Sequence, residues 1–253
     1  MNIIGKDMKI VITPAKRMYQ EIDYFDALSK PIYIKESEII LNKLKTLTVN
    51  EVKKLLKCND KIAKEAYDNY QSMNLNNNLV PAMFAYKGIQ YEQMAPHILT
   101  DEDYMFAKKH LRILSGFYGV LRPFDGVVPY RLELNDKLVV DEYCSLYEFW
   151  GNKIYQELIK DDKEILDLGA KQYTRIIKKY LTDDIKYVKC YFMEKRSDGY
   201  QEIGVYVKKA RGQMTRYLIE NKVNCFDQVK NFNELGYVFN EQMSNEQNYV
   251  FVR

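Results

Sequence analysis

The chain has few of the side chains that metal and disulfide sites need. Its 253 residues include only two histidines, His97 and His110, and neither has a partner at metal-ligand spacing. We therefore expect no bound metal, neither a zinc site nor a ferritin-type di-iron site built on Glu-x-x-His. The four cysteines lie far apart and form no CxxC pair, at positions 58, 144, 190 and 225. This spacing predicts reduced thiols, and we expect no cofactor.

Long apolar runs are also missing. No stretch approaches the ~20 apolar residues that span a bilayer, and the first residues lack the charged, apolar and small-residue series of a signal peptide. The chain is 47% hydrophobic and 29% charged, values typical of a globular protein. We expect one domain over residues 1–253, a cytoplasmic location and no contact with a membrane.

The net charge of +3 conceals an uneven distribution of bases. Residues 108–131 carry five Lys or Arg against one acid, 171–180 carry four against none, and 207–222 carry five against one. Each window alone is typical of a solvated helix face. Together they predict a shared basic surface that attracts polyanions.

Apolar periodicity and turn signals predict alternating helices and strands in one mixed α/β domain. The predicted helices cover about 37–47, 48–57, 60–73, 100–114, 144–160, 169–180 and 209–221. The predicted strands cover 8–12, 82–86, 164–168, a hairpin around 196–199, and two short segments near the C-terminus. Thr48 with Glu51 forms a capping-box pattern, and Thr100 is the expected cap of the helix that follows it.

Three segments have the composition of a functional site. The first is "TPAKR" (13–17), which follows the first strand. A lysine such as Lys16 at the carboxyl end of a strand stands where open α/β sheets bind ligands. A solvent-exposed lysine in a turn explains these five residues equally well.

The second segment, "RILSGFYGVLRPFDGVVPYRLEL" (112–134), combines three glycines, two prolines and three arginines. Gly116 and Gly119 permit a backbone whose N–H groups converge on an anion, as in a helix–hairpin–helix that holds a DNA phosphate. Arg122 and Arg131 stand beside prolines that stiffen the backbone. The alternative is a helix end at Gly116, with Tyr118 in the core.

The third segment, "YVKKARGQMTRYLIEN" (206–221), reads as a strand that continues into a helix. Lys208, Lys209 and Arg211 would then lie at the helix start, where free N–H groups add to the positive field. A basic amphipathic helix that only packs is the alternative.

With these segments in view, nearly the whole chain resembles the YaaA-type peroxide-stress proteins. The motifs that carry the resemblance are "ITPAK" (12–16), "FAYKGIQY" (84–91), "HLRILSGFYGVLRPFDGVVPYRLEL" (110–134), "LYEFWGNKI" (146–154), "KKARGQM" (208–214) and "ELGYVF" (234–239). The family start aligns with Met8, so residues 1–7 look like an extension. Where the family tends to have "NLAS-x-EY", this chain reads "DLGAKQY" (167–173), with Ala170 and Gln172 in place of a serine and a glutamate.

The resemblance implies a single α/β domain of unusual topology, with a helix–hairpin–helix-like element and a basic cleft that binds duplex DNA largely independently of sequence. It also implies a role in peroxide stress that limits iron-dependent damage. We expect a monomer. The residues carried over as DNA-binding are Lys16, Lys87, Arg112, Gly116, Gly119, Arg122, Arg131, Lys208, Lys209 and Arg211.

An enzyme acting on a nucleobase, nucleotide or nucleic acid in the same cleft is the alternative. Glu133 beside Arg131, together with Lys16, could supply the carboxylate and amine that a glycosylase or lyase needs. We expect Glu133 to be locked in an ion pair. No catalytic residue is assigned, and a protein-interaction module is a third possibility.

Overall fold

The computed structural model describes residues 7–20, 22, 25–197 and 199–253. Except for Asp7, the predicted extension at residues 1–7 lies outside the described residues. The Asp7 carboxylate pairs with Lys109 Nζ at 2.5 Å. The described chain is a mixed α/β structure, as the sequence predicts.

The central feature is an eight-stranded, mainly parallel sheet with the order β11-β12-β9-β8-β1-β5-β6, in which β10 also pairs with β9. Strand β1 pairs in parallel with β5 on one side and β8 on the other. All five residues of β1 are buried, as expected for a strand covered on both faces. The strands are β1 (Met8–Ile12), β5 (Leu111–Ser115), β6 (Gly119–Leu121), β8 (Glu164–Asp167), β9 (Lys186–Arg196), β10 (Gly199–Gln201), β11 (Val238–Phe239) and β12 (Asn248–Val252).

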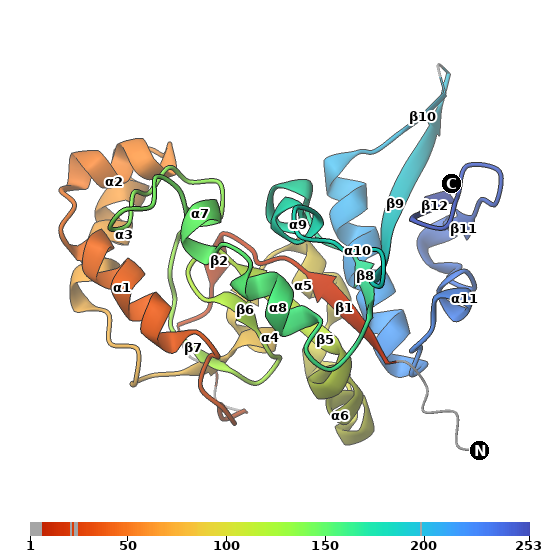
Figure 1. Cartoon of the computed structure of the whole chain (residues 1–253), viewed down its shortest axis with the longest axis horizontal. Helices are drawn as coiled ribbons and strands as arrows, with labels where there is room; N and C mark the ends of the chain where they lie inside the picture. Colours follow the sequence, from red (N-terminus) through yellow and green to blue (C-terminus); the bar gives the residue numbers. More distant parts are fainter. Residues whose placement is uncertain (1–6, 21, 23–24, 198) are drawn as a thin grey trace.

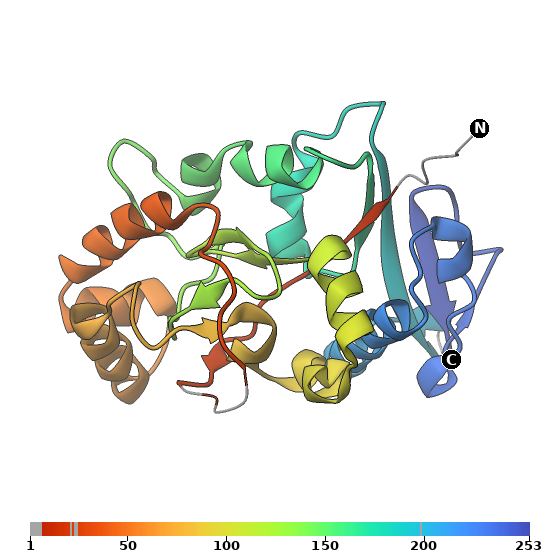
Figure 2. The ribbon, with the colours of Figure 1, turned by 90° about the horizontal axis from the view of Figure 1, so that it is seen from below.

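Helices cover both faces of this sheet. Figure 2 shows α7, α8 and α9 on one side and α5, α6 and α10 on the other. Helices α1, α2 and α3 lie together at the end far from β12 (Figure 1). The helices are α1 (Ile34–Lys45), α2 (Val49–Leu56), α3 (Asp60–Ser72), α4 (Ala82–Ala85), α5 (Ile89–Met94), α6 (Asp101–His110), α7 (Leu146–Trp150), α8 (Lys153–Leu158), α9 (Lys171–Lys178), α10 (Gly204–Glu220) and α11 (Phe226–Val229).

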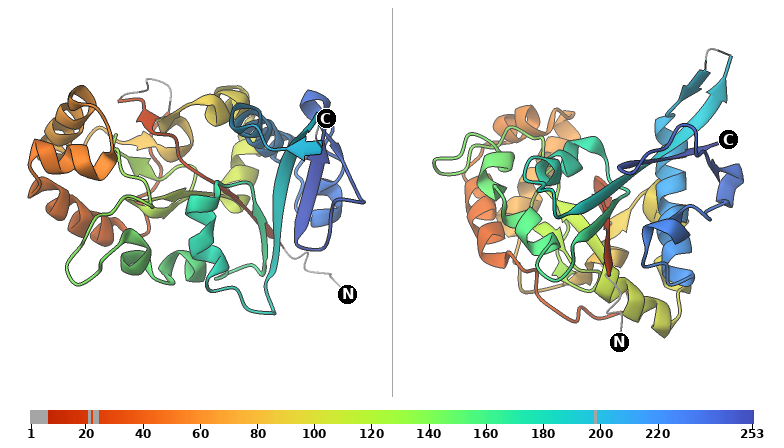
Figure 3. Two further views of the ribbon diagram at one scale, coloured as in Figure 1. Left: turned by 90° about the horizontal axis from the view of Figure 1, so that it is seen from above. Right: turned by 45° about the vertical axis from the view of Figure 1, so that its right-hand side comes forward.

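Two short strand pairs lie outside the main sheet. Strand β2 (Arg17–Met18) pairs with β4 (Tyr86–Lys87), and β3 (Val80–Pro81) pairs with β7 (Gly126–Val127). The β2–β4 pair sets Arg17 opposite Lys87. It therefore joins the segment after β1 to the segment before α5. At the other end of the molecule, the β9–β10 hairpin extends away from the body (Figure 3).

Local signals fix several helix starts. The Thr48 side chain accepts a bond from Glu51 N–H, and Glu51 returns a bond to the Thr48 backbone, so the predicted capping box is confirmed. The same reciprocal arrangement joins Thr100 to Asp103 at the start of α6. Asn59 caps α3 through Ile62 N–H. Each cap satisfies N–H groups that the first helical turn leaves free.

Four predicted elements are wrong in type or extent. The segment 82–86 is mainly the short helix α4 and not a strand. The helix predicted to reach residue 114 ends at residue 110, and the apolar run that follows is strand β5. The helix predicted over 144–160 is two helices, α7 and α8, separated at Gly151 with φ of 48°. Residues 204–209 are the first turns of α10, so Lys208, Lys209 and Arg211 lie inside a helix and not at a strand-to-helix junction.

The helix–hairpin–helix element predicted at 112–123 is a buried β-hairpin formed by β5 and β6. Its glycines are required by packing. A Cβ on Gly116 would lie 2.8 Å from backbone atoms of Glu133 and Leu134, and one on Gly119 (φ +74°) would lie 2.8 Å from the Trp150 ring. Trp150 also donates Nε1–H to the Gly116 carbonyl at 2.9 Å. The indole therefore occupies the space in which an anion would have to sit.

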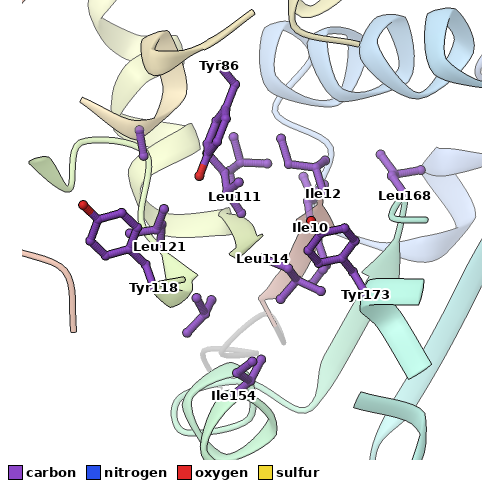
Figure 4. Close-up of a cluster of buried hydrophobic side chains, with 14 of the residues drawn as sticks. Ile10, Ile12, Tyr86, Leu111, Leu114, Tyr118, Leu121, Ile154, Leu168 and Tyr173 are labelled. Atoms are coloured by element: carbon purple, nitrogen blue, oxygen red, sulfur yellow. The ribbon is translucent and has the colours of Figure 1, made fainter. Parts of the chain in front are cut away.

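The core runs along β1. Figure 4 shows Ile10 and Ile12 among side chains from β5, β6, α8 and α9. These side chains are among those with little or no exposed surface. The tight packing holds the carboxyl end of β1 in a fixed position relative to its neighbours.

Candidate functional site

The sheet topology marks one crevice as the place for a ligand. The chain leaves β1 toward β5 on one side, and leaves β8 toward β9 on the other. Connections that diverge in this way open a crevice at the carboxyl ends of the two strands, where open α/β sheets bind ligands. Residues 13–16 follow β1 and residues 168–170 follow β8. The Lys16 segment therefore occupies the position predicted for it.

A small pocket lies at this edge. It is formed by the turn after β1, the end of α2, the segment 130–136 and the first turn of α9. The lining residues are Pro14, Ala15, Lys16, Leu56, Tyr130, Arg131, Leu132, Glu133, Asp136 and Tyr173. The fold thus brings together Lys16, Arg131 and Glu133, the three residues grouped from the sequence.

Glu133 is locked in an ion pair, as expected. Lys16 Nζ lies 2.7 Å from Glu133 Oε2, and Gln172 Nε2 donates to Glu133 Oε1 at 3.0 Å. The Lys16 side chain is 58% exposed and that of Glu133 is 24% exposed. Gln172 is one of the two departures from the family pattern, and here it holds the carboxylate. A ligand that needs either charge must compete with this pair.

Asp136 is a second carboxylate in the pocket, which sequence reasoning missed. Its Oδ2 accepts the Glu133 backbone N–H at 2.8 Å. Burial, helped by the nearby charge of Glu133, raises the pKa of Asp136 to about 6. The pocket therefore holds one paired carboxylate and one that changes protonation near neutral pH. The i,i+3 spacing of the two acids was visible in the sequence, but not their burial.

Buried tyrosines support the pocket from behind. The hydroxyl of Tyr130 lies 2.9 Å from the hydroxyl of Tyr86 and 2.7 Å from Ser115 Oγ. Burial raises the pKa of Tyr130 to about 12, so it stays a neutral donor. Tyr70 donates its hydroxyl to the Arg131 carbonyl. These bonds fix the backbone on both sides of Arg131.

Three of the predicted DNA-binding arginines are engaged inside the protein. Arg112 donates through one guanidinium nitrogen to the carbonyls of Lys108, Lys109 and Leu111. Arg122 forms an ion pair at 2.8 Å with Asp125, whose side chain is fully buried. Arg211 retains 9% of its surface. Arg112 and Arg211 are therefore buried, whereas Arg122 is held by Asp125 and its side chain stays 37% exposed.

The other predicted bases face solvent. Lys16, Lys87, Lys208 and Lys209 are exposed and Arg131 is half-buried. Lys87 Nζ lies 5.1 Å from the centre of the exposed Tyr19 ring. Gly88 approaches Ala15, and α5, which follows Lys87, packs against α10. The segments that carry these bases are therefore neighbours in the fold, and whether they form one basic cleft stays a prediction.

A buried polar cluster at the end of β8 was also missed. Asp167 accepts bonds from Lys189 Nζ at 2.7 Å, from Gly169 N–H at 2.6 Å and from the Tyr187 hydroxyl. The available signal was an aspartate ending an apolar strand. Since an acid there is seldom buried without a partner, it indicates a site at the sheet edge.

The described ranges contain neither a cluster of metal ligands nor a helix that could cross a membrane. Within them, no group of three or more His, Cys, Asp or Glu is placed to hold a metal ion. His110 is buried with Nδ1 at 2.9 Å from the Met8 carbonyl, and burial lowers its pKa. All four cysteines are free. None of the described helices has the length and apolar character needed to cross a membrane.

Fold and site together define an α/β protein with an open, mainly parallel sheet and a polar pocket at its carboxyl edge. The family described as peroxide stress protein YaaA matches residues 8–243, and the chain belongs to this family. This confirms the resemblance seen in the sequence and supports a role in peroxide stress.

Relatives match along almost their full length. A UPF0246 protein, DSY0297, of Desulfitobacterium hafniense is 46% identical, covering 97% of this chain and 98% of that protein. UPF0246 proteins of Ligilactobacillus salivarius and Pediococcus pentosaceus are 43% and 42% identical, each over 97% of this chain and over 100% and 98% of their own lengths.

Proposed function

We propose that the protein acts in peroxide stress by binding duplex DNA, largely independently of sequence, and so limits damage from peroxide and unincorporated iron. One observation supports this proposal. Five of the predicted bases keep solvent exposure on neighbouring segments: Lys16, Lys87, Lys208 and Lys209 are exposed, and Arg131 is partly exposed. Of the five, only Lys16 has a carboxylate of a described residue within ion-pair distance. Unpaired surface bases are the groups that neutralise phosphates.

The number of available bases sets the expected salt dependence. Each neutralised phosphate contributes about −0.9 to the slope of log K against log salt. Five contacts therefore predict a slope of about −4 to −5. Arg112, Arg122 and Arg211 add nothing to this value, because their guanidinium groups are engaged or buried.

The test is fluorescence anisotropy of two duplexes of unrelated sequence, titrated at several salt concentrations. The double variant Lys208→Gln/Lys209→Gln should flatten the slope by about 2. The matched control is Lys35→Gln/Lys61→Gln, which removes two exposed lysines on the α1–α3 end of the molecule. A slope near zero, a strong preference for one sequence, or equal losses in the two double variants would refute the proposal.

A second candidate is an enzyme that acts on a nucleobase, nucleotide or nucleic acid at the pocket. It is favoured by two carboxylates with different environments in one pocket, because hydrolytic sites commonly combine a general acid with a general base. Glu133 is paired with Lys16, and the pKa of Asp136 is about 6.

Glu133→Gln separates the two candidates. If the protein only binds DNA, the affinity of this variant should be equal or slightly higher, since a negative charge near phosphate is lost. Survival of peroxide-treated cells should then follow DNA affinity. Loss of survival with unchanged DNA affinity would favour the enzyme. Arg131→Lys provides a second comparison: it should damage a bidentate small-molecule site nearly as much as Arg131→Ala, but a duplex contact only slightly.

A further inference from the structure

Arg211 stands on α10 with little exposed surface, and its Nε is buried without a hydrogen-bond partner in the described structure. Only 9% of its surface is exposed. Its Nε has no hydrogen-bond partner, and no carboxylate of a described residue lies within ion-pair distance. Burial lowers the pKa of this guanidinium, while the charge of Asp167 partly opposes the shift. A buried guanidinium without hydrogen bonds is among the least stable arrangements in a protein.

The backbone around Arg211 prevents it from moving outward. A Cβ at Gly212 would overlap the carbonyl oxygen of Gln90, so α10 lies directly against α5. The Thr215 hydroxyl donates to the Arg211 carbonyl at 2.7 Å. Helix α10, which carries Arg211, contacts both α5 and β9.

The nearest buried carboxylate is already saturated. Asp167 accepts from Lys189, Tyr187 and the Gly169 backbone. Lys189 in turn donates to the Gly169 carbonyl at 3.0 Å. The charge of Glu202 also acts on Arg211, but no carboxylate of a described residue lies within ion-pair distance of its guanidinium.

Gln90 provides a second unpartnered donor at the same contact. It also retains 9% of its surface, and its amide Nε2 has no hydrogen-bond partner. The next residue, Tyr91, donates its hydroxyl to the Thr13 carbonyl at 3.1 Å, which holds α5 over the end of β1. Gly169, after β8, closely approaches the Thr13 methyl group. Gln90 therefore belongs to a helix held over the end of β1, and the charge of Asp167 at the end of β8 acts on Arg211.

We propose that the seam between α5, α10 and the carboxyl ends of β1 and β8 binds the oxyanion group, phosphate or carboxylate, of a small molecule. The guanidinium and amide donate to its oxygens, and the negative charge of the ligand pairs with a guanidinium that has no carboxylate of a described residue within ion-pair distance. Arg is suited to this role because its planar fork meets both kinds of oxyanion in two parallel bonds. The site is separate from duplex binding, because these donors are too buried to reach a DNA backbone.

Thermal unfolding of the full chain tests the site. Sodium phosphate and sodium acetate are titrated separately at constant ionic strength, with sodium chloride as the reference. At least one oxyanion should raise the melting temperature with a saturating dependence, and which one does so identifies the group. Arg211→Met should lower the affinity for that anion at least about thirtyfold, since a buried charged partner of the anion is lost. Gln90→Leu should lower the same affinity by about two- to tenfold.

Lys61→Met is the control, because it removes an exposed lysine on α3 and should leave anion binding unchanged. Without anion, Arg211→Met should melt no lower than the unaltered protein, since an unpaired buried charge has been removed. If Arg211→Met fails to fold, Gln90→Leu decides the question. Equal responses to phosphate, acetate and chloride, or unchanged oxyanion affinity in Gln90→Leu, would overturn the proposal and leave buried water as the partner of both donors.

Discussion

Replacing Asp136 with asparagine should stabilise the protein near neutral pH. The side chain is partly buried and its pKa is about 6, against 3.8 for an ordinary aspartate. The folded state thus binds a proton more tightly than the unfolded chain does. Stability from this group is complete below about pH 4 and is lost as pH rises through 6. Asparagine cannot ionise, so the variant escapes this loss.

The magnitude follows from the size of the shift. About two units at ~1.4 kcal/mol per unit set an upper limit of about 3 kcal/mol. Because the side chain is only partly buried, solvent screening reduces this to about 1–2 kcal/mol. The Glu133 N–H that Asp136 accepts can be accepted equally by the asparagine carbonyl oxygen, so no hydrogen bond needs to be lost.

The assay is urea unfolding at pH 4, 5, 6 and 7.5. The variant should gain about 1–2 kcal/mol over the unaltered protein at pH 7.5 and nothing at pH 4. Asp184→Asn is the control, because bonds from Thr182 and Lys163 lower the pKa of that exposed aspartate. Its replacement should not stabilise at pH 7.5. A destabilised Asp136→Asn protein with no pH dependence would show that Asp136 is a paired carboxylate and would refute the reasoning.

Three further substitutions test other parts of the structure. Gly119→Ala should destabilise the protein by about 2–5 kcal/mol in urea unfolding, because alanine is strained at this φ and its Cβ would clash with Trp150. The control is Gly204→Ala, where no atom lies within 4 Å of the added Cβ, and its stability should stay within about 1 kcal/mol of the unaltered protein. Arg122→Ala should cost about 2–3 kcal/mol of stability, since it leaves the buried Asp125 without its ion pair. The DNA affinity of this variant in anisotropy should stay unchanged. A loss of DNA affinity with normal stability would support the DNA-binding role predicted for Arg122. Lys189→Met should cost about 3–5 kcal/mol of stability, because it leaves the buried Asp167 carboxylate unpaired. The double variant Lys189→Met/Asp167→Asn should lose less stability than Lys189→Met, because that carboxylate is then removed.

Features set by neighbouring residues were predictable from the sequence. The first strand is a short apolar run ending before a proline, and the starts of α2, α3 and α6 depend on caps within three residues. Part of the pocket was also predictable, because a lysine after a buried strand lies at the sheet edge whatever the rest of the fold. The ion pair expected for Glu133 is also confirmed, and its partner is Lys16.

Features that depend on distant contacts were not predictable in this way. Nothing local separates the apolar run 111–114 from the end of a helix, and its pairing with β1 decides for a strand. Gly116 and Gly119 suggested an anion site, but their partner is Trp150, which lies far along the chain. For α10 a signal was available: Val207, Ala210, Met214 and Leu218 are buried at helical spacing, while the β-branched residues near its start favoured a strand.

The central position of β1 has a consequence for how the protein folds during synthesis. Ile10 pairs with Leu111 and with Leu166, so β1 leaves the ribosome long before either neighbour exists. Helices α1–α3 contact one another locally and can form early, whereas parallel pairing between distant segments is slow. An apolar strand that waits for its partners is exposed to aggregation. The yield of folded protein should therefore depend on translation rate and on chaperones that shield the nascent N-terminal segment.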